Sequence, residues 1–163
     1  MAIRRPIVAA CVCLTFILTA LPSSAAPKVY RKSARASFLS GEDFRNLDLR
    51  GVVFFSADLR KANFSRSKLA NASFEGSELV KSLFRKVKAR GASFEGADLT
   101  RADLRGADLR GADMERAVLR GARLKGARLG KIQWKNTICP DGSNSDSHRN
   151  TCVGHLSPIG PKT

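Results

Sequence analysis

A row of acidic and amide side chains recurs in this sequence at multiples of five residues. Carboxylates of this kind can bind divalent metals or act as general acids and bases. Because the row is periodic, we interpret it instead as turn chemistry, in which Asp and Asn side chains hydrogen-bond nearby backbone. We therefore predict no catalytic and no metal-binding residue in it. The row comprises Asp43, Asp48, Asp58, Asn63, Asp98, Asp103, Asp108 and Asp113.

Two cysteines and two histidines lie together near the C-terminal end, namely Cys139, His148, Cys152 and His155. An even number of cysteines in an exported chain favours a disulfide, because oxidising compartments keep such pairs bonded. We therefore predict a disulfide between Cys139 and Cys152. A zinc site made of the same four side chains is the alternative, since Cys and His are the ligands that zinc prefers.

The same tail carries oxygen ligands in Asp141, Ser143, Asn144 and Asp146. These residues could surround a calcium ion, but the spacing lacks the distal bidentate Glu of an EF-hand, so a disulfide-closed turn is favoured. The sequence contains no nucleophile elbow, phosphate loop or zinc-protease pattern. We therefore predict no enzyme activity, no metal and no cofactor, and a polysaccharide-cleaving β-helix is the weakest alternative.

The first 25 residues have the pattern of a secretory signal peptide. Arg4 and Arg5 precede an apolar run from 7 to 21, which is short for a membrane span. Small residues at Ser23 and Ala25 then fit a cleavage site after Ala25. We expect a bacterial periplasmic or secreted chain with no transmembrane span after cleavage, although the sequence leaves open whether the signal is kept as an anchor.

Large apolar residues recur at every fifth position from Leu39 to Trp134, and only Ala89 in this series is small. Neither an α-helix nor a simple strand places a five-residue period on one face. We call each of these large apolar residues the centre of its repeat. Ala or Ser stands two residues before most centres, and Gly often follows two residues after them. One large and one small inward residue per repeat suits a chain that turns a corner every five residues.

This pattern resembles the pentapeptide-repeat family, whose motif reads A-(D/N)-L-x-x. The matches include Ala97-Asp98-Leu99-Thr100-Arg101 and Ala102-Asp103-Leu104-Arg105-Gly106. The resemblance covers about residues 37–136. It implies an all-β fold, a right-handed quadrilateral parallel β-helix with four repeats in each coil and about five coils.

The order of the core residues supports four repeats in each coil independently. Phe and Leu alternate from Phe44 to Phe84, so each coil must hold an even number of repeats if like residues are to stack. Four repeats place Phe44, Phe64 and Phe84 in one column and give each coil a nearly constant core volume. We expect Trp134 to close the last coil and the Cys139–Cys152 loop to fold over its edge.

The chain carries 29 Lys and Arg residues against 14 Asp and Glu residues, a net charge of +15. The residues that follow each centre should point outward and form two adjoining basic faces and one acidic face, with Asp103 and Asp108 partly neutralising their neighbours. A basic excess favours anionic partners, although charge alone names none. The candidate anion-binding residues are Arg45, Arg50, Arg85, Lys88, Arg90, Arg105, Arg110, Lys125 and Arg128.

We predict four segments: a signal peptide (1–25), a basic N-terminal lead (26–36), the repeat β-helix (37–136) and a disulfide-closed cap and tail (137–163). The expected function is that of an exported non-catalytic scaffold that binds another, unknown protein. The alternative is a basic-face binder of anionic polymers such as lipopolysaccharide, envelope polysaccharide or nucleic acid. Some members of the family are acidic mimics of DNA that bind DNA gyrase, a role that the positive charge and the expected export argue against.

Overall fold

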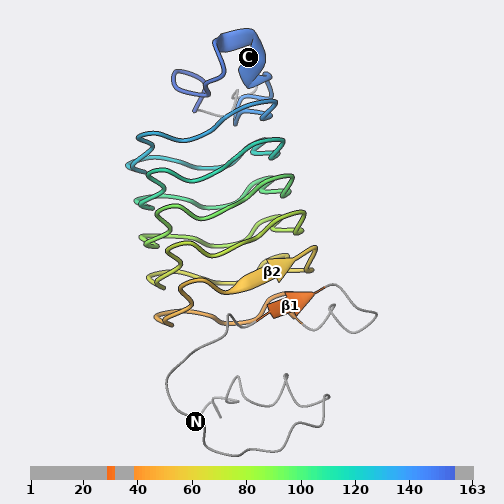
Figure 1. Cartoon of the computed structure of the whole chain (residues 1–163), viewed down its shortest axis with the longest axis vertical. Coiled ribbons are helices and arrows are strands. Elements are labelled where there is room, and N and C mark those ends of the chain that lie inside the picture. The colour runs from red at the N-terminus through yellow and green to blue at the C-terminus, as the bar shows by residue number, and fades with distance from the viewer. Residues whose placement is uncertain (1–28, 32–38, 157–163) are drawn as a thin grey trace, which may run out of the picture.

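A computed structural model describes residues 29–31 and 39–156 of the chain. These residues form a stack of coils that rises from the strands β1 and β2 to the C-terminal end (Figure 1). The elements are β1 (Val29–Arg31), β2 (Val53–Phe55) and the short 3-10 helix η3 (Ser145–His148). The predicted signal peptide, most of the predicted lead and the end of the tail lie outside the described ranges.

Parallel bridges join residues that stand four repeats apart along the chain. Asp43 pairs with Asn63, Asn63 pairs with Leu83, and the same spacing continues to the pair of Val118 and Ile138. The bridges carry short backbone hydrogen bonds, as between the Phe64 nitrogen and the Leu83 oxygen at 2.8 Å. One turn of the coil therefore takes four repeats, and the stacked turns form a β-helix.

The centres of the repeats fill the interior of the coil, as the five-residue period predicts. All of them are buried except Leu39 and Leu129, which lie near the two ends and are partly exposed. Phe44, Phe64 and Phe84 stack in one column with ring centroids 4.7 and 4.9 Å apart. A second Phe column meets the first edge to face at 5.4–5.8 Å, so the predicted stacking is confirmed.

The corners of the coil need small residues inside and a left-handed backbone outside. The alanines in the small slot are buried from Ala57 to Ala122, and where Ser replaces Ala its hydroxyl donates to a backbone oxygen, as from Ser82 to Leu79 at 2.6 Å. The residue two positions after each centre has a positive φ, as at Gly106 with 68°. Glycine adopts this conformation without a Cβ penalty, which explains its frequency in that slot.

Both ends of the described stack are covered by chain. β1 pairs in parallel with β2, with Val29 opposite Val53, and so covers the first turn where the sequence had indicated only a lead. At the other end Asn144 pairs antiparallel with Ile138, and Trp134 is buried at 4% exposure. Covered edges leave fewer free backbone groups for pairing with another chain. No helix in the described ranges is long and apolar enough to cross a membrane.

Candidate binding faces

The outward residues of each repeat flank its buried centre on both sides. In the sequence Asp103-Leu104-Arg105, the leucine points inward, so the carboxylate and the guanidinium lie side by side on the outer surface. The backbone N–H of Arg105 also donates to the Asp103 carboxylate at 3.3 Å. This local turn bond recurs along the row, for example from Thr100 to Asp98 at 2.9 Å. The interpretation of the aspartate row as turn chemistry is therefore confirmed at these positions.

Five of the nine candidate anion-binding residues form ion pairs with these aspartates. Arg45 pairs with Asp43 at 2.6 Å, and Arg50 pairs with Asp48 at 2.8 Å. The remaining pairs are Arg110 with Asp108 at 2.6 Å and, at 2.7 Å each, Arg85 and Arg105 with the shared Asp103. The predicted neutralisation at Asp103 and Asp108 is thus present, and it extends to the first coils.

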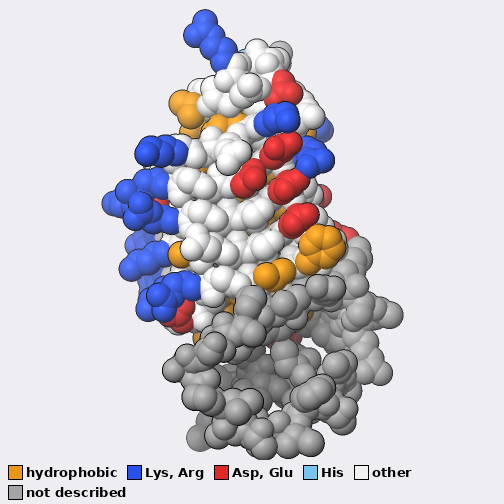
Figure 2. Space-filling model, in the orientation of Figure 1, with side chains coloured by type: hydrophobic (Ala, Val, Ile, Leu, Met, Phe, Trp, Pro, Cys, Tyr) orange, Lys and Arg blue, Asp and Glu red, His pale blue; other side chains and the backbone are white. Residues whose placement is uncertain are grey.

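The other four candidates are Lys88, Arg90, Lys125 and Arg128. Each side chain is exposed, and within the described residues none of them forms an ion pair. Figure 2 shows basic side chains gathered along one side of the stack and a row of acidic ones along another. The free cations on the basic faces are therefore fewer than a count of Arg and Lys suggests, because every Asp-x-Arg repeat pairs its own arginine. The D-x-R spacing itself was the signal that could have revealed this.

Asp103 is the most enclosed carboxylate of the row, with 5% of its side chain exposed. Burial opposes its ionisation, but the hydrogen bonds from Arg105 and Arg85 outweigh burial and hold its pKa well below the usual range. At Asp108 the hydrogen bond from Arg110 is the largest effect and lowers the pKa to about 2. Both carboxylates are therefore charged at neutral pH.

Asp103→Asn is expected to lower the free energy of unfolding by about 1–3 kcal/mol at pH 7, because two arginines lose their charged acceptor. A lowered native pKa stabilises the fold above about pH 4, the range of unfolded Asp, and this contribution disappears as the pH falls through the native pKa. The deficit should therefore shrink progressively as the pH is lowered below about 4. Urea denaturation of the variant and of the unaltered chain at three pH values measures the difference in the free energy of unfolding.

Asp113→Asn is the matched control for this experiment. Asp113 occupies the same slot and accepts the backbone N–H of Glu115 at 2.9 Å, and it forms no ion pair within the described chain. It should cost less than Asp103→Asn, because it takes a charged acceptor from no arginine. Equal losses in the two variants would contradict the assigned role of the arginine pairs.

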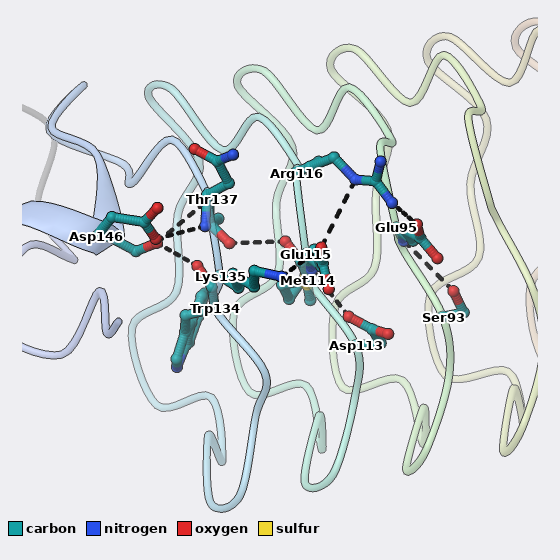
Figure 3. A network of polar contacts seen from close by, with 12 residues as sticks. Ser93, Glu95, Asp113, Met114, Glu115, Arg116, Trp134, Lys135, Thr137 and Asp146 are labelled. Atoms are coloured by element: carbon teal, nitrogen blue, oxygen red, sulfur yellow. Dashed lines mark hydrogen bonds and ion pairs between the residues drawn. The ribbon is translucent and has the colours of Figure 1, made fainter. Parts of the chain in front are cut away.

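The acidic face is itself tied together by cations from the corners and the last coil. Figure 3 shows Arg116 reaching both Glu95 and Glu115, while Lys135 lies 3.6 Å from Glu115. Phe55, which stands below Glu75 in the same column, is 44% exposed. The acidic residues of this face are therefore joined by ion pairs, and the column ends at the apolar side chain of Phe55.

The tail forms the predicted disulfide between Cys139 and Cys152. The pairing takes both thiolates away from the alternative zinc site. The Asp141 carboxylate accepts bonds from Ser143 at 2.9 and 2.6 Å and lies 2.6 Å from the His155 ring. Burial raises the pKa of Asp141, but these hydrogen bonds outweigh it and lower the pKa overall.

The other oxygens considered for calcium serve the backbone of the cap. Asn144 accepts from the Asp146 nitrogen at 2.8 Å, and Asp146 accepts from the Asn136 nitrogen at 2.6 Å (Figure 3 shows Asp146 beside the last coil). Among the residues in the described ranges, no cluster of three acidic, His or Cys side chains is arranged to hold a metal ion. These oxygens bind the cap to the coil.

A family model described as pentapeptide repeats matches residues 35–69, 67–106 and 97–131 in 8 copies. The matched segments together cover more than half of the chain. The chain belongs to the pentapeptide-repeat family. The five-residue period, the buried centres and the bridges between residues four repeats apart are the structural expression of these repeats.

Solved structures of pentapeptide-repeat proteins resemble this one. Rfr23 from the cyanobacterium Cyanothece 51142 is 27% identical with a TM-score of 0.60, over 61% of this chain and 81% of that chain. A thylakoid-lumen protein from Arabidopsis thaliana is 22% identical with a TM-score of 0.47, over 78% and 86%. QnrB1, a plasmid-mediated fluoroquinolone resistance protein, is 18% identical with a TM-score of 0.33, over 75% and 93%. None of the curated proteins compared matches the chain.

Proposed function

We propose that this pentapeptide-repeat protein is an exported, non-catalytic scaffold that holds a partner protein against its flat outer faces. The observation that carries the proposal is the uninterrupted register of bridges, one coil to the next, from Asp43 to Ile138. That register fixes each outward side chain in a column above its equivalent one coil below. A surface of this kind presents a fixed charge pattern to a partner, which favours orientation and selectivity in binding.

The proposal includes the expected architecture and location. A right-handed coil of about five turns is what family membership and the four-repeat turn support. Export to the periplasm or beyond the cell rests on the signal pattern in residues 1–25 and on the use of two cysteines in a disulfide, which persists in oxidising compartments. Mimicry of DNA toward gyrase is not part of the proposal, because the net charge is +15.

Site-specific photocrosslinking tests the scaffold proposal. A photoreactive residue is placed on each of the four faces in turn, at Lys125, Arg90, Glu75 and Val80, and the chain is irradiated in the cell that makes it. We expect an adduct of one defined mass from one face or from two adjoining faces. Adducts from no face, or the same mixture from all four, would contradict a fixed binding face.

The second candidate function is the binding of an anionic polymer, and it is favoured by the four exposed candidate cations that lack ion pairs. Lys88 and Arg90 flank the buried Ala89 and project from the same coil. We expect retention on heparin or lipopolysaccharide that falls steeply with salt, because screening weakens exposed charge interactions. Lys88→Gln with Arg90→Gln should elute at clearly lower salt than the unaltered chain.

Lys61→Gln with Arg149→Gln is the matched control, since it removes the same charge from exposed positions away from Lys88 and Arg90. It should change the elution by less than half as much. Equal shifts would show that net charge alone causes retention. Binding that is insensitive to salt would exclude this second function and leave protein binding as the role.

A further inference from the structure

A shallow groove of about 600 Å³ lies on the face that the sequence analysis left without a role. Val80, Thr100 and Gly121 contribute short side chains or none at all to its lining. Lys81, Arg101 and Arg120 add three cations to this lining. Pro140 and Asp141 line it from the first residues of the cap. The groove thus spans three neighbouring coils and the cap.

The three groove cations differ from the paired arginines on the other faces. All three are exposed, and within the described chain none of them takes part in an ion pair. Arg120 follows the centre of a repeat that has Val118 where the Asp-x-Arg repeats have an aspartate. Lys81 and Arg101 occupy the corner slot, and neither follows an aspartate by two residues as the paired arginines do. The positive charge in the groove is therefore left available.

This corner has the left-handed backbone of the other corners, but it carries a run of cations. Lys61, Lys81 and Arg101 follow one another in a single column, and each has a φ of 59°. A non-glycine residue in this left-handed region is disfavoured, and glycine or asparagine fits it better. No other corner of the described coil carries three successive cations. The run of cations, rather than the backbone conformation, distinguishes this corner from the others.

Glycine in the next coil leaves room for one of these side chains. A Cβ atom at Gly121 would lie 3.3 Å from the Cγ atom of Arg101, which is closer than ordinary packing. The Arg101 side chain therefore runs over Gly121, along the edge of the groove. The Asp141 carboxylate at the upper end binds Ser143 and the His155 ring, so its oxygens are already engaged within the cap.

We propose that this groove binds a compact anion of the phosphate or sulfate ester class, with Lys81, Arg101 and Arg120 as its cationic ligands. Charge-assisted hydrogen bonds from guanidinium and ammonium groups suit tetrahedral oxyanions. The Thr100 hydroxyl supplies a neutral donor in the same groove. None of these residues belongs to the nine candidates on the basic faces, so the site stands independently of polymer binding there.

Isothermal titration of the purified chain with pyrophosphate at low ionic strength tests the site. Lys81→Asn with Arg101→Asn removes two ligands, and the fold should tolerate it because Asn71 and Asn136 already fill the same slot with φ of 57°. We expect Kd to rise at least about tenfold, as for the loss of charged hydrogen bonds. Thermal melts check that both variants stay folded.

The matched control is Lys86→Asn with Lys131→Asn. Both lysines are exposed, occupy the same left-handed slot at φ of 54° and 58°, and lie outside the groove. Their loss should change Kd less than about twofold, because only generic attraction falls. Equal weakening in the two variants, or no pyrophosphate binding by the unaltered chain, would overturn the proposal.

A parallel titration with a sulfated disaccharide identifies the source of the anion. Tighter binding of the disaccharide than of pyrophosphate, lost in the groove variant alone, assigns the site to a sulfated glycan. Tighter binding of pyrophosphate with the same pattern of loss assigns it to a phosphate group. An acetate titration should give no heat, and acetate binding as tight as pyrophosphate binding would count against an oxyanion site.

Discussion

Phe74→Ala is expected to lower the free energy of unfolding by about 3–5 kcal/mol, because a buried aromatic ring is replaced by a cavity. Phe74 has no exposed surface. Its ring stacks on Phe54 and Phe94 at 5.1 Å and meets Phe64 and Phe84 edge to face. Each coil contacts mainly its neighbours in a solenoid, so a gap at this position breaks the column on both sides. Urea denaturation followed by circular dichroism measures the change.

Phe55→Ala is the control, because Phe55 is the same residue type on the outside of the coil at 44% exposure. Its loss should change the stability by less than about 0.5 kcal/mol, as is usual at the surface. The contrast between the two variants tests the inward direction of the five-residue series. Similar losses from both, or an unchanged midpoint for Phe74→Ala, would contradict the assignment of the core.

The joint replacement of Cys139 and Cys152 by Ser is expected to cost about 2–4 kcal/mol. The disulfide spans 13 residues of sequence, and both cysteines are fully buried. Without it, the cap gains freedom in the unfolded state and the last coil loses its cover, so unfolding should begin at the C-terminal end. The denaturation midpoint of the double variant, compared with the oxidised chain, measures this effect.

Val153→Ser is the control for the disulfide variant, since Val153 lies next to Cys152 and is 61% exposed. It should leave the midpoint nearly unchanged. The oxidised chain treated with a reductant should lose about as much stability as the double variant. A midpoint that neither reduction nor the double replacement shifts would show that the cap does not hold the end of the coil.

The two stability predictions bear on function because the outer faces depend on the frame beneath them. The Phe columns fill the interior beneath the outward side chains, and the cap supplies Pro140 and Asp141 to the groove. Loss of the disulfide should therefore weaken anion binding in the groove more than Phe55→Ala does. The pyrophosphate titration, repeated on the double cysteine variant and on Phe55→Ala, measures this difference in binding.

The sequence determined the frame because its repeat is strictly periodic. Because every fifth residue is large and apolar, Phe64, Leu79 and Leu109 are expected to face one interior, and the alternation of Phe and Leu requires an even number of repeats in each coil. The Cys139–Cys152 pair followed from cysteine count and the expected compartment. These features are local or periodic, so they can be predicted from the linear sequence alone.

The tertiary structure decided which charges remain free. The sequence analysis named Arg45, Arg50, Arg85, Arg105 and Arg110 as one anion-binding set, whereas the structure pairs all five with aspartates. Arg85 reaches Asp103 in the next coil, and the groove joins Lys81 to Arg120 and the cap. These contacts depend on how the coils lie over one another and on where side chains point across the gap between them. A repeat pattern fixes the columns, but the ion pairs and hollows between columns exist only once the chain is coiled.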